Sequence, residues 1–173
     1  MEKSKIIKEV LSYLLIIVLV ILIKKYIFTP IRVNGSSMYP TLEGNDVMIL
    51  NEIGYHLNGI ERFDIVVLNY NNERLIKRII GMPNDKLEYR DNRLYINDDV
   101  YVEEFEHGKT DDFKLSDILK ENDGIIPDGY YFVVGDNRQN SVDSRTIGLI
   151  SKKEILGKTN FIVFPFNRLG KVK

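Results

Sequence analysis

The sequence predicts a mainly β domain that follows an N-terminal transmembrane helix. An uncharged apolar run at residues 10–23 predicts the helix. Beyond residue 30, short runs rich in Val, Ile, Leu, Tyr and Phe alternate with Gly, Asn and Asp turn signals, which is typical of antiparallel sheets and barrels. The chain has 173 residues, 44% of them hydrophobic, which is enough for one moderate core.

The N-terminal apolar segment has the length of a membrane anchor. A helix over residues 6–23 would span about 27 Å at about 1.5 Å per residue, close to the hydrocarbon thickness of a bilayer. Lys24 and Lys25 end the segment, and no small-residue cleavage site follows them. A cleavable signal peptide and a buried core helix are the alternatives. Lysines flank the segment on both sides, so the positive-inside rule barely orients it.

These features divide the chain into a short N-terminus at residues 1–5, an anchor at residues 6–25 and one domain at residues 26–173. Within the domain, residues 85–130 hold a hairpin and a variable insertion. The most polar stretch, residues 103–122, is expected at the surface.

The expected strands share β-branched or aromatic residues between turn signals. They are residues 31–33, 46–50, 64–68, 74–80, 87–89, 94–96, 130–134 and 159–164. The polar turn at Asp91 and Asn92 predicts a hairpin between residues 87–89 and 94–96. Short helices are expected at residues 111–120, capped by Asp111 or Asp112, and at residues 151–156, opened by a Ser151–Glu154 capping box.

Composition excludes several classes of function. The chain has no cysteine, which excludes disulfides, thiolate zinc sites and a cysteine nucleophile. The net charge of −1, with basic residues spread among acidic ones, argues against nucleic acid as a partner. No metal site and no cofactor are expected. His56 and His107 lie in polar stretches without a Gly-x-Ser-x-Gly elbow, so we expect surface histidines rather than a Ser-His-Asp triad.

Three clusters of polar, Gly and Pro residues interrupt the apolar strands, and each taken singly is typical of an ordinary turn. Their sequences are S-M-x-P-T-L from Ser37, K-R-I-I-G-x-P-x-D from Lys77 and G-D-N-R-x-x-S-x-D-S-R from Gly135. In this order they resemble the boxes of the type I signal peptidase (leader peptidase) family, in its short bacterial form with a single anchor. The resemblance runs from the anchor to the C-terminus and implies a signal-peptidase-like antiparallel β fold.

The resemblance implies a Ser-Lys dyad, with Ser37 as the nucleophile and Lys77 as its general base. A lysine in water has a pKa near 10.4, so the base requires apolar burial that disfavours the ammonium form. Ser141 is expected to hydrogen-bond the Lys77 amine and align it with Ser37. Without the other two boxes, Lys77 would be interpreted as a solvated lysine on a strand.

The sequence indicates only one of the two hydrogen-bond donors expected for the oxyanion. The backbone N–H of Ser37 is the expected donor. Some members of the family add a serine hydroxyl two positions before the nucleophile, where this chain has Gly35. The second donor is therefore left open, with a backbone N–H or a water near Gly35 as candidates.

Charged residues of the second and third boxes are expected to form an ion-pair scaffold for the catalytic loop. They are Arg78, Asp136, Asp143 and Arg145. A carboxylate that completes a triad is the alternative role for Asp143. Asn137 and Arg138 are expected to be turn and surface residues.

The resemblance also implies that the substrates are signal-peptide-bearing preproteins, cut after small residues at −1 and −3. An extended peptide would bind beside strand edges at residues 31–35 and before Lys77. Each pocket residue proposed beside these edges is also compatible with plain core. They are Ile31, Val33, Met38, Leu42, Leu75 and Ile76.

The family topology implies a single pass through the bacterial cell membrane, with the N-terminus inside and the catalytic domain outside. Membrane anchoring would align the enzyme with substrates held in the same bilayer.

Two other functions remain open from the sequence. A catalytically weak or inactive signal-peptidase-like membrane protein would bind peptides or partners, and the departure at Gly35 keeps this alternative open. A soluble Ser-Lys self-cleaving regulator would need a DNA-binding helical domain and an internal cleavage site, and neither is visible in the sequence.

Overall fold

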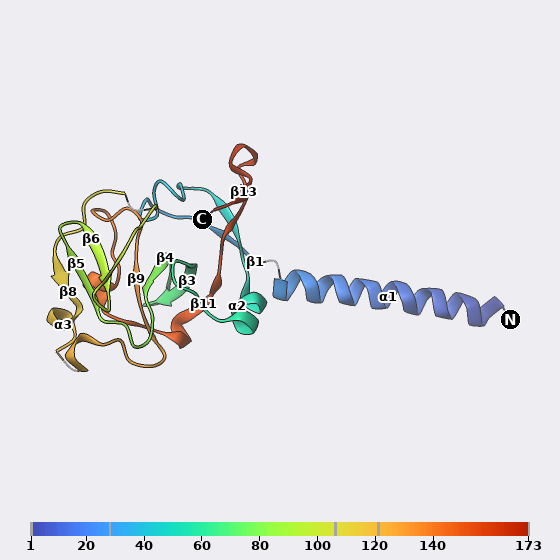
Figure 1. The fold of residues 1–173 in the computed structure, drawn as a ribbon. Coiled ribbons are helices and arrows are strands. Elements are labelled where there is room, and N and C mark those ends of the chain that lie inside the picture. Colours follow the sequence, from blue (N-terminus) through green and yellow to red (C-terminus); the bar gives the residue numbers. More distant parts are fainter. Residues whose placement is uncertain (1, 28, 106, 121, 173) are drawn as a thin grey trace.

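The computed structural model describes residues 2–27, 29–105, 107–120 and 122–172, and in the first helix the side chains of residues 5–20. This helix, α1 (Glu2–Ile27), extends away from the β domain (Figure 1). Its described apolar side chains are exposed. Within the described part of the chain, no helix is both long enough and apolar enough to cross a membrane. The transmembrane assignment therefore stays a prediction.

The domain that follows is mainly β, as predicted, and the pairs between its described strands are all antiparallel. The described strands form three sheets, in the orders β1-β2-β12-β13, β10-β9-β4-β3-β11 and β7-β6-β5-β8. The strands are β1 (Thr29–Arg32), β2 (Val47–Leu50), β3 (Ile65–Tyr70), β4 (Glu73–Gly81), β5 (Leu87–Arg90), β6 (Arg93–Ile96), β7 (Asp99–Tyr101), β8 (Phe113–Lys114), β9 (Tyr130–Val134), β10 (Ile150–Ser151), β11 (Ile155–Lys158), β12 (Phe161–Phe164) and β13 (Gly170–Lys171).

The five-stranded sheet contains the long strand β4, which carries Lys77 and Arg78. The two sides of β4 are paired over different lengths. On one side, β3 pairs with β4 along its length, from Ile65 opposite Arg78 to Tyr70 opposite Glu73. On the other side, β9 pairs with β4 from Arg78 onward. Residues 73–77 of β4 therefore keep an edge that no described strand occupies.

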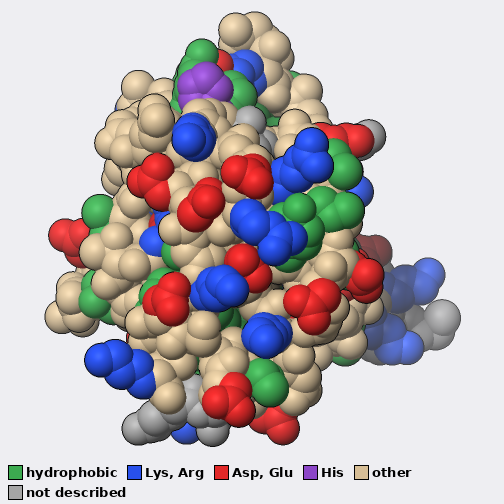
Figure 2. Space-filling view, turned by 60° about the vertical axis from the view of Figure 1, so that its left-hand side comes forward, with side chains coloured by type: hydrophobic (Ala, Val, Ile, Leu, Met, Phe, Trp, Pro, Cys, Tyr) green, Lys and Arg blue, Asp and Glu red, His purple; other side chains and the backbone are tan. Residues whose placement is uncertain are grey.

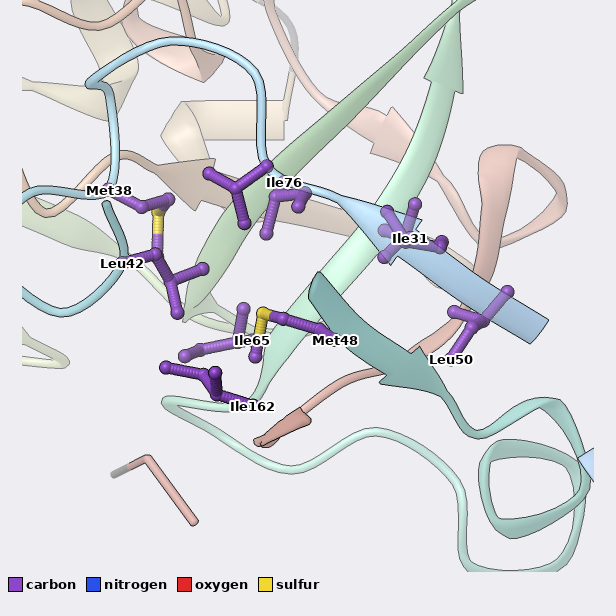
Figure 3. Close-up of a cluster of buried hydrophobic side chains, with 10 residues drawn as sticks. Ile31, Met38, Leu42, Met48, Leu50, Ile65, Ile76 and Ile162 are labelled. Atoms are coloured by element: carbon purple, nitrogen blue, oxygen red, sulfur yellow. The ribbon is translucent and has the colours of Figure 1, made fainter. Parts of the chain in front are cut away.

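A hydrophobic core joins the sheet of β1 and β2 to β3 and β4. Figure 3 shows side chains from these strands converging, among them Ile31, Met48, Ile65 and Ile76. Met48 is fully buried, and burial of each such side chain stabilises the fold by about 1.5–3 kcal/mol. The core therefore fixes the position of β1 relative to β4.

The predicted hairpin forms between β5 and β6, with Leu87 opposite Ile96 and Arg90 opposite Arg93. Asp91 and Asn92 have φ values of 53° and 59°. Positive φ at both central residues gives the mirror-image two-residue turn that matches the twist of antiparallel strands. The hairpin prediction is confirmed.

The helical predictions are partly wrong. Residues 111–120 begin with β8, which pairs with β5, so the helix shortens to α3 (Leu115–Ile118) and neither predicted aspartate caps it. Residues 151–156 form one 3-10 turn, η2 (Lys152–Glu154), with the predicted Ser151–Glu154 capping box. The helix α2 (Glu52–Asn58) was not predicted. The other described helical turns are η1 (Asn122–Gly124), α4 (Ser144–Ile147) and η3 (Phe166–Arg168).

The surface carries both signs of charge close together. On the face shown in Figure 2, Lys and Arg side chains are interspersed with Asp and Glu side chains. His56 and His107 are exposed, as predicted. Such an arrangement produces no strong field of one sign over this face.

Candidate active site

Ser37 and Lys77 lie 40 positions apart in the chain and meet in the fold. Ser37 is in the turn that follows β1, and Lys77 is on β4 at the last position before β9 begins to pair. A hydrogen bond of 2.7 Å joins Lys77 Nζ and Ser37 Oγ. The two residues are thus in direct reach for proton transfer.

The environment of Lys77 increases the fraction of its amine that is neutral. Its side chain is 3% exposed, and burial lowers its pKa from 10.5 to about 8. Asp143 and Asp136 act in the opposite direction by favouring the ammonium, while Arg145 adds to the lowering. A neutral amine at this position can accept the Ser37 proton, which a solvated lysine at neutral pH cannot do.

The backbone around Ser37 is held in place while its N–H stays available. The Ser37 carbonyl accepts a hydrogen bond of 3.0 Å from the Asn137 N–H, and the Asn137 side chain donates to the Ser36 carbonyl. No hydrogen bond within the described residues uses the Ser37 N–H. This N–H is the donor available to an oxyanion.

Gly35 contributes no side-chain donor to this site, and its backbone shows why glycine suits the position. Its φ is 89°, a conformation that other residues seldom adopt, and a Cβ there would meet no atom within 4 Å. Backbone conformation, and not steric contact, therefore limits which residues suit position 35.

Arg78 and Asp136 form a buried, bidentate ion pair beneath the site. Arg78 Nε donates to Asp136 Oδ1 at 2.8 Å and Nη2 donates to Oδ2 at 2.7 Å, with both side chains 1% exposed. The Thr41 hydroxyl, which the sequence interpretation missed, donates to the same carboxylate at 2.6 Å. One carboxylate thus connects the turn that holds Ser37, strand β4 and the loop at residues 135–145.

Asp143 and Arg145 form the second predicted ion pair, at 2.7 Å between Arg145 Nη2 and Asp143 Oδ2. The Gly135 N–H donates to the same carboxylate oxygen at 3.0 Å. Burial opposes ionisation of Asp143, but Arg145 and this N–H outweigh it and lower the pKa of Asp143. The contacts place Asp143 as a brace for the loop at residues 135–145.

Ser141 does not make the predicted hydrogen bond to Lys77 in this structure. Its Oγ is buried and has no hydrogen-bond partner within the described residues. A Cβ at position 135 would lie 2.3 Å from this Oγ, so Gly135 leaves the space that the Ser141 side chain occupies. The predicted contact with Lys77 is therefore absent in this conformation, in which Ser141 packs on Gly135 and its hydroxyl helps to lower the pKa of Asp143.

Arg138 is buried and not at the surface, which corrects the prediction. It is 3% exposed and pairs with Glu103 at 2.6 Å. The prediction failed because the partner of Arg138, Glu103, lies in the polar stretch at residues 103–122, which was expected at the surface. Asn137 is half-buried and lies in the loop as predicted.

A groove of about 600 Å³ runs from the dyad between β1 and the unpaired edge of β4. It passes Ser37 and Lys77, and of the six predicted pocket residues, five line it. They are Ile31, Val33, Met38, Leu75 and Ile76. Leu42 does not line it, because its side chain is fully buried in the core (Figure 3). The expectation for Leu42 is therefore wrong.

In the described part of the chain, no group of three or more His, Asp or Glu side chains is close enough to hold a metal ion. The described hydrogen bonds of Ser37 join it to the Lys77 amine and to the Asn137 backbone amide. These groups suit acyl transfer by a serine nucleophile.

Comparisons with known proteins agree with this chemistry. A family model described as "Signal peptidase, peptidase S26" matches residues 6–164. Signal peptidase I from Bacillus amyloliquefaciens is 38% identical over 99% of this chain and 95% of its own length. Signal peptidase I S from Bacillus subtilis (strain 168) is 39% identical over 98% of this chain and 95% of its own length.

A solved structure gives the same result for the β domain. Signal peptidase I from Enterococcus faecalis V583 aligns with a TM-score of 0.53 and 35% identity, over 57% of this chain and 95% of that one. A match of this extent, together with full-length relatives above 30% identity, shows both family and class of enzyme. The chain therefore belongs to the signal peptidase family, peptidase S26, and is a serine peptidase.

Proposed function

We propose that this chain removes signal peptides from exported preproteins with Ser37 as nucleophile and Lys77 as general base. The observation that carries the proposal is the 2.7 Å contact between Ser37 Oγ and the buried Lys77 amine, whose pKa is lowered to about 8. Relatives named signal peptidase I supply the substrate class.

In the proposed mechanism, Lys77 Nζ accepts the Ser37 proton as Oγ attacks the scissile carbonyl carbon. The negative charge that develops on the carbonyl oxygen is stabilised by the Ser37 N–H. Collapse of the tetrahedral intermediate breaks the C–N bond, and Lys77 gives its proton to the leaving amine. Lys77 then takes a proton from water as its oxygen attacks the acyl ester, and gives that proton to Ser37 Oγ as the ester C–O bond breaks.

The groove suits an extended peptide that adds to the free edge of β4. Residues 73–77 of β4 present backbone groups that β9 does not use, and β1 forms the opposite wall. Alternate side chains of a bound strand point into such a groove. Because Met38 and Ile76 border it and are almost fully buried, we infer pockets near Ser37 that admit small residues at −1 and −3.

A preprotein with alanine at −1 and −3 is expected to be cut once by the purified full chain, directly after the −1 residue. Replacing the −1 alanine by leucine should lower kcat/KM about tenfold or more, because overfilling a packed pocket is unfavourable. Mass spectrometry of the products identifies the bond, and a change at −2 serves as the control. Equal cleavage of the alanine and leucine substrates would contradict the proposed pockets.

We further propose that residues 6–25 anchor the chain in the bacterial cell membrane, with residues 26–173 outside. Support comes from the exposed apolar side chains of α1, such as Leu11, Leu14 and Leu15 and from the uncharged run that continues to residue 23. Anchoring would hold the groove near substrates in the same bilayer.

The full chain, expressed in bacteria, is therefore expected to remain with membranes in high salt or alkaline carbonate and to be released by detergent. Fractionation followed by immunoblotting measures this, with a variant that begins at residue 26 as the control. Release of the full chain by salt alone would contradict the anchor, as would equal retention of the shortened variant.

A further inference from the structure

The polar stretch at residues 103–122, called the insertion below, contacts the loop at residues 135–145, called the catalytic loop, through backbone hydrogen bonds. The His107 N–H donates to the Asp136 carbonyl at 2.8 Å, and the Arg138 N–H donates to the His107 carbonyl at 2.9 Å. Between these bonds, His107 and Asn137 form a parallel bridge. Asn137 in turn donates its N–H to the Ser37 carbonyl. The catalytic loop is thus held between the insertion and the nucleophile.

A buried ion pair fastens the same two segments. The side chains of Arg138 and Glu103 are 0% and 2% exposed, with 2.6 Å between Nη2 and Oε1 and 3.2 Å between Nη1 and Oε2. The Tyr89 hydroxyl, on β5, donates to Glu103 at 2.9 Å, and Arg138 Nη1 donates to Thr110 at 2.9 Å. Arg138 Nε donates to the Gly135 carbonyl at 3.2 Å. The guanidinium therefore ties the first residue of the catalytic loop to the insertion.

The charge of this pair makes the arrangement sensitive to a single substitution. A guanidinium enclosed by protein needs a compensating carboxylate, because an uncompensated buried charge is strongly unfavourable. Loss of the Glu103 charge weakens the two charged hydrogen bonds that Arg138 donates to this carboxylate, so the guanidinium is held less firmly. A shift of Arg138 would move Gly135 and Asn137, whose backbone contacts fix the loop and the Ser37 carbonyl.

We propose that Glu103 is a positioning residue for hydrolysis: through its buried pair with Arg138 it holds the catalytic loop, and thereby keeps Ser37 in line with Lys77. The proposal rests on the proposed function of the dyad. Small displacements of reacting groups cost large factors in rate, so a loop shift that leaves the fold intact is sufficient. The groove between β1 and β4 makes no use of Glu103, so peptide binding remains.

The test compares Glu103→Gln with Glu104→Gln in the full chain, with cleavage of one preprotein as the assay. Glutamine keeps the size of Glu103 and removes its charge, while Glu104 is the exposed neighbour. The Glu103 variant is expected to lose about tenfold or more in kcat with KM within twofold. The Glu104 variant should match the unsubstituted chain. Assays run well below each unfolding midpoint, measured by circular dichroism.

Tyr89→Phe gives a second, milder change in case Glu103→Gln does not fold. It removes one hydroxyl from the network and leaves the ion pair, so a kcat loss of about threefold or more is expected with KM unchanged. A folded Glu103 variant with kcat within twofold of the unsubstituted chain would overturn the inference. If that variant is unfolded, an unchanged kcat for Tyr89→Phe overturns it.

The unsubstituted chain and Ser37→Ala separate this inference from the proposed function. Cleavage that depends on Ser37, together with an unchanged Glu103 variant, overturns the positioning role alone. Absence of Ser37-dependent cleavage by the unsubstituted chain overturns both proposals.

Discussion

Replacing Lys77 by methionine is expected to lower kcat for preprotein cleavage about a thousandfold or more, because the general base is lost. Methionine matches the buried stem of Lys77 and carries no amine, so Ser37 Oγ keeps its proton. The side chain is 3% exposed, so a neutral replacement removes a buried ionisable group and should not unfold the domain. Single-turnover cleavage measures the chemical step, and thermal unfolding checks the fold.

Lys153→Met is the matched control for this substitution, because Lys153 is exposed and lies outside the groove. It should retain full activity. Ser37→Ala should show a loss comparable to that of Lys77→Met, and the double variant should lose little more, since the two residues act as a unit. Retention of more than a tenth of the rate by the Lys77 variant would remove Lys77 from the mechanism.

The second large effect is a dependence of the rate on pH. Because burial lowers the pKa of Lys77 to about 8, its neutral fraction, and with it kcat/KM, should fall about tenfold per pH unit below pH 8. Between pH 8 and pH 6 the loss is about fiftyfold, and about a pH unit above 8 the profile levels. The rate is measured with a preprotein that has no titrating group near the cut.

A stability measurement gives an independent check on the same shift. The unfolded chain binds a proton at Lys77 up to its ordinary pKa of 10.5, whereas the folded chain releases it near 8. The unfolded state therefore holds more protons between these values, and the Lys77 contribution to the free energy of unfolding rises with pH there. The difference between the unsubstituted chain and Lys77→Met gives the Lys77 contribution to the free energy of unfolding.

For the rate experiment, a flat profile between pH 6 and pH 8 would refute the assignment of Lys77 as the base.

Local patterns were sufficient for the parts of the fold whose geometry is set by neighbours in the sequence. The β5–β6 hairpin follows from Asp91 and Asn92, which tolerate positive φ, and the turn at Ser151 follows from its capping box. The helix α2 was missed although Asn51 provides a cap, since seven residues that include Gly54 give a weak helical signal.

Other errors came from contacts between segments that are distant in the chain. Pairing of β8 with β5 replaced the first turn of the helix expected at residues 111–120. Arg138 appeared to be a surface residue because its partner Glu103 lies in a polar stretch 35 positions earlier. No pattern in the sequence indicates that Glu103 and Arg138 pair, because the pair forms only when the folded chain brings these two segments together.

The site itself was predicted from ordered motifs and not from local propensity. Ser37 and Lys77 lie together as expected, while Ser141 packs on Gly135 and Leu42 lies in the core. Residue types in a motif indicate which atoms are near one another. Their hydrogen bonds depend on packing that a one-dimensional pattern does not contain.

The Asp136 carboxylate has a consequence for when hydrolysis becomes possible. It joins Thr41, 95 positions earlier, and Arg78, 58 positions earlier, so the nucleophile turn is braced only after the loop beyond β9 has been made and folded. Closing such long loops is entropically costly and delays contacts of this kind. A chain synthesised only as far as β9 therefore still lacks the carboxylate that joins the turn of Ser37 to β4, and the proposed dyad would not yet be held by it.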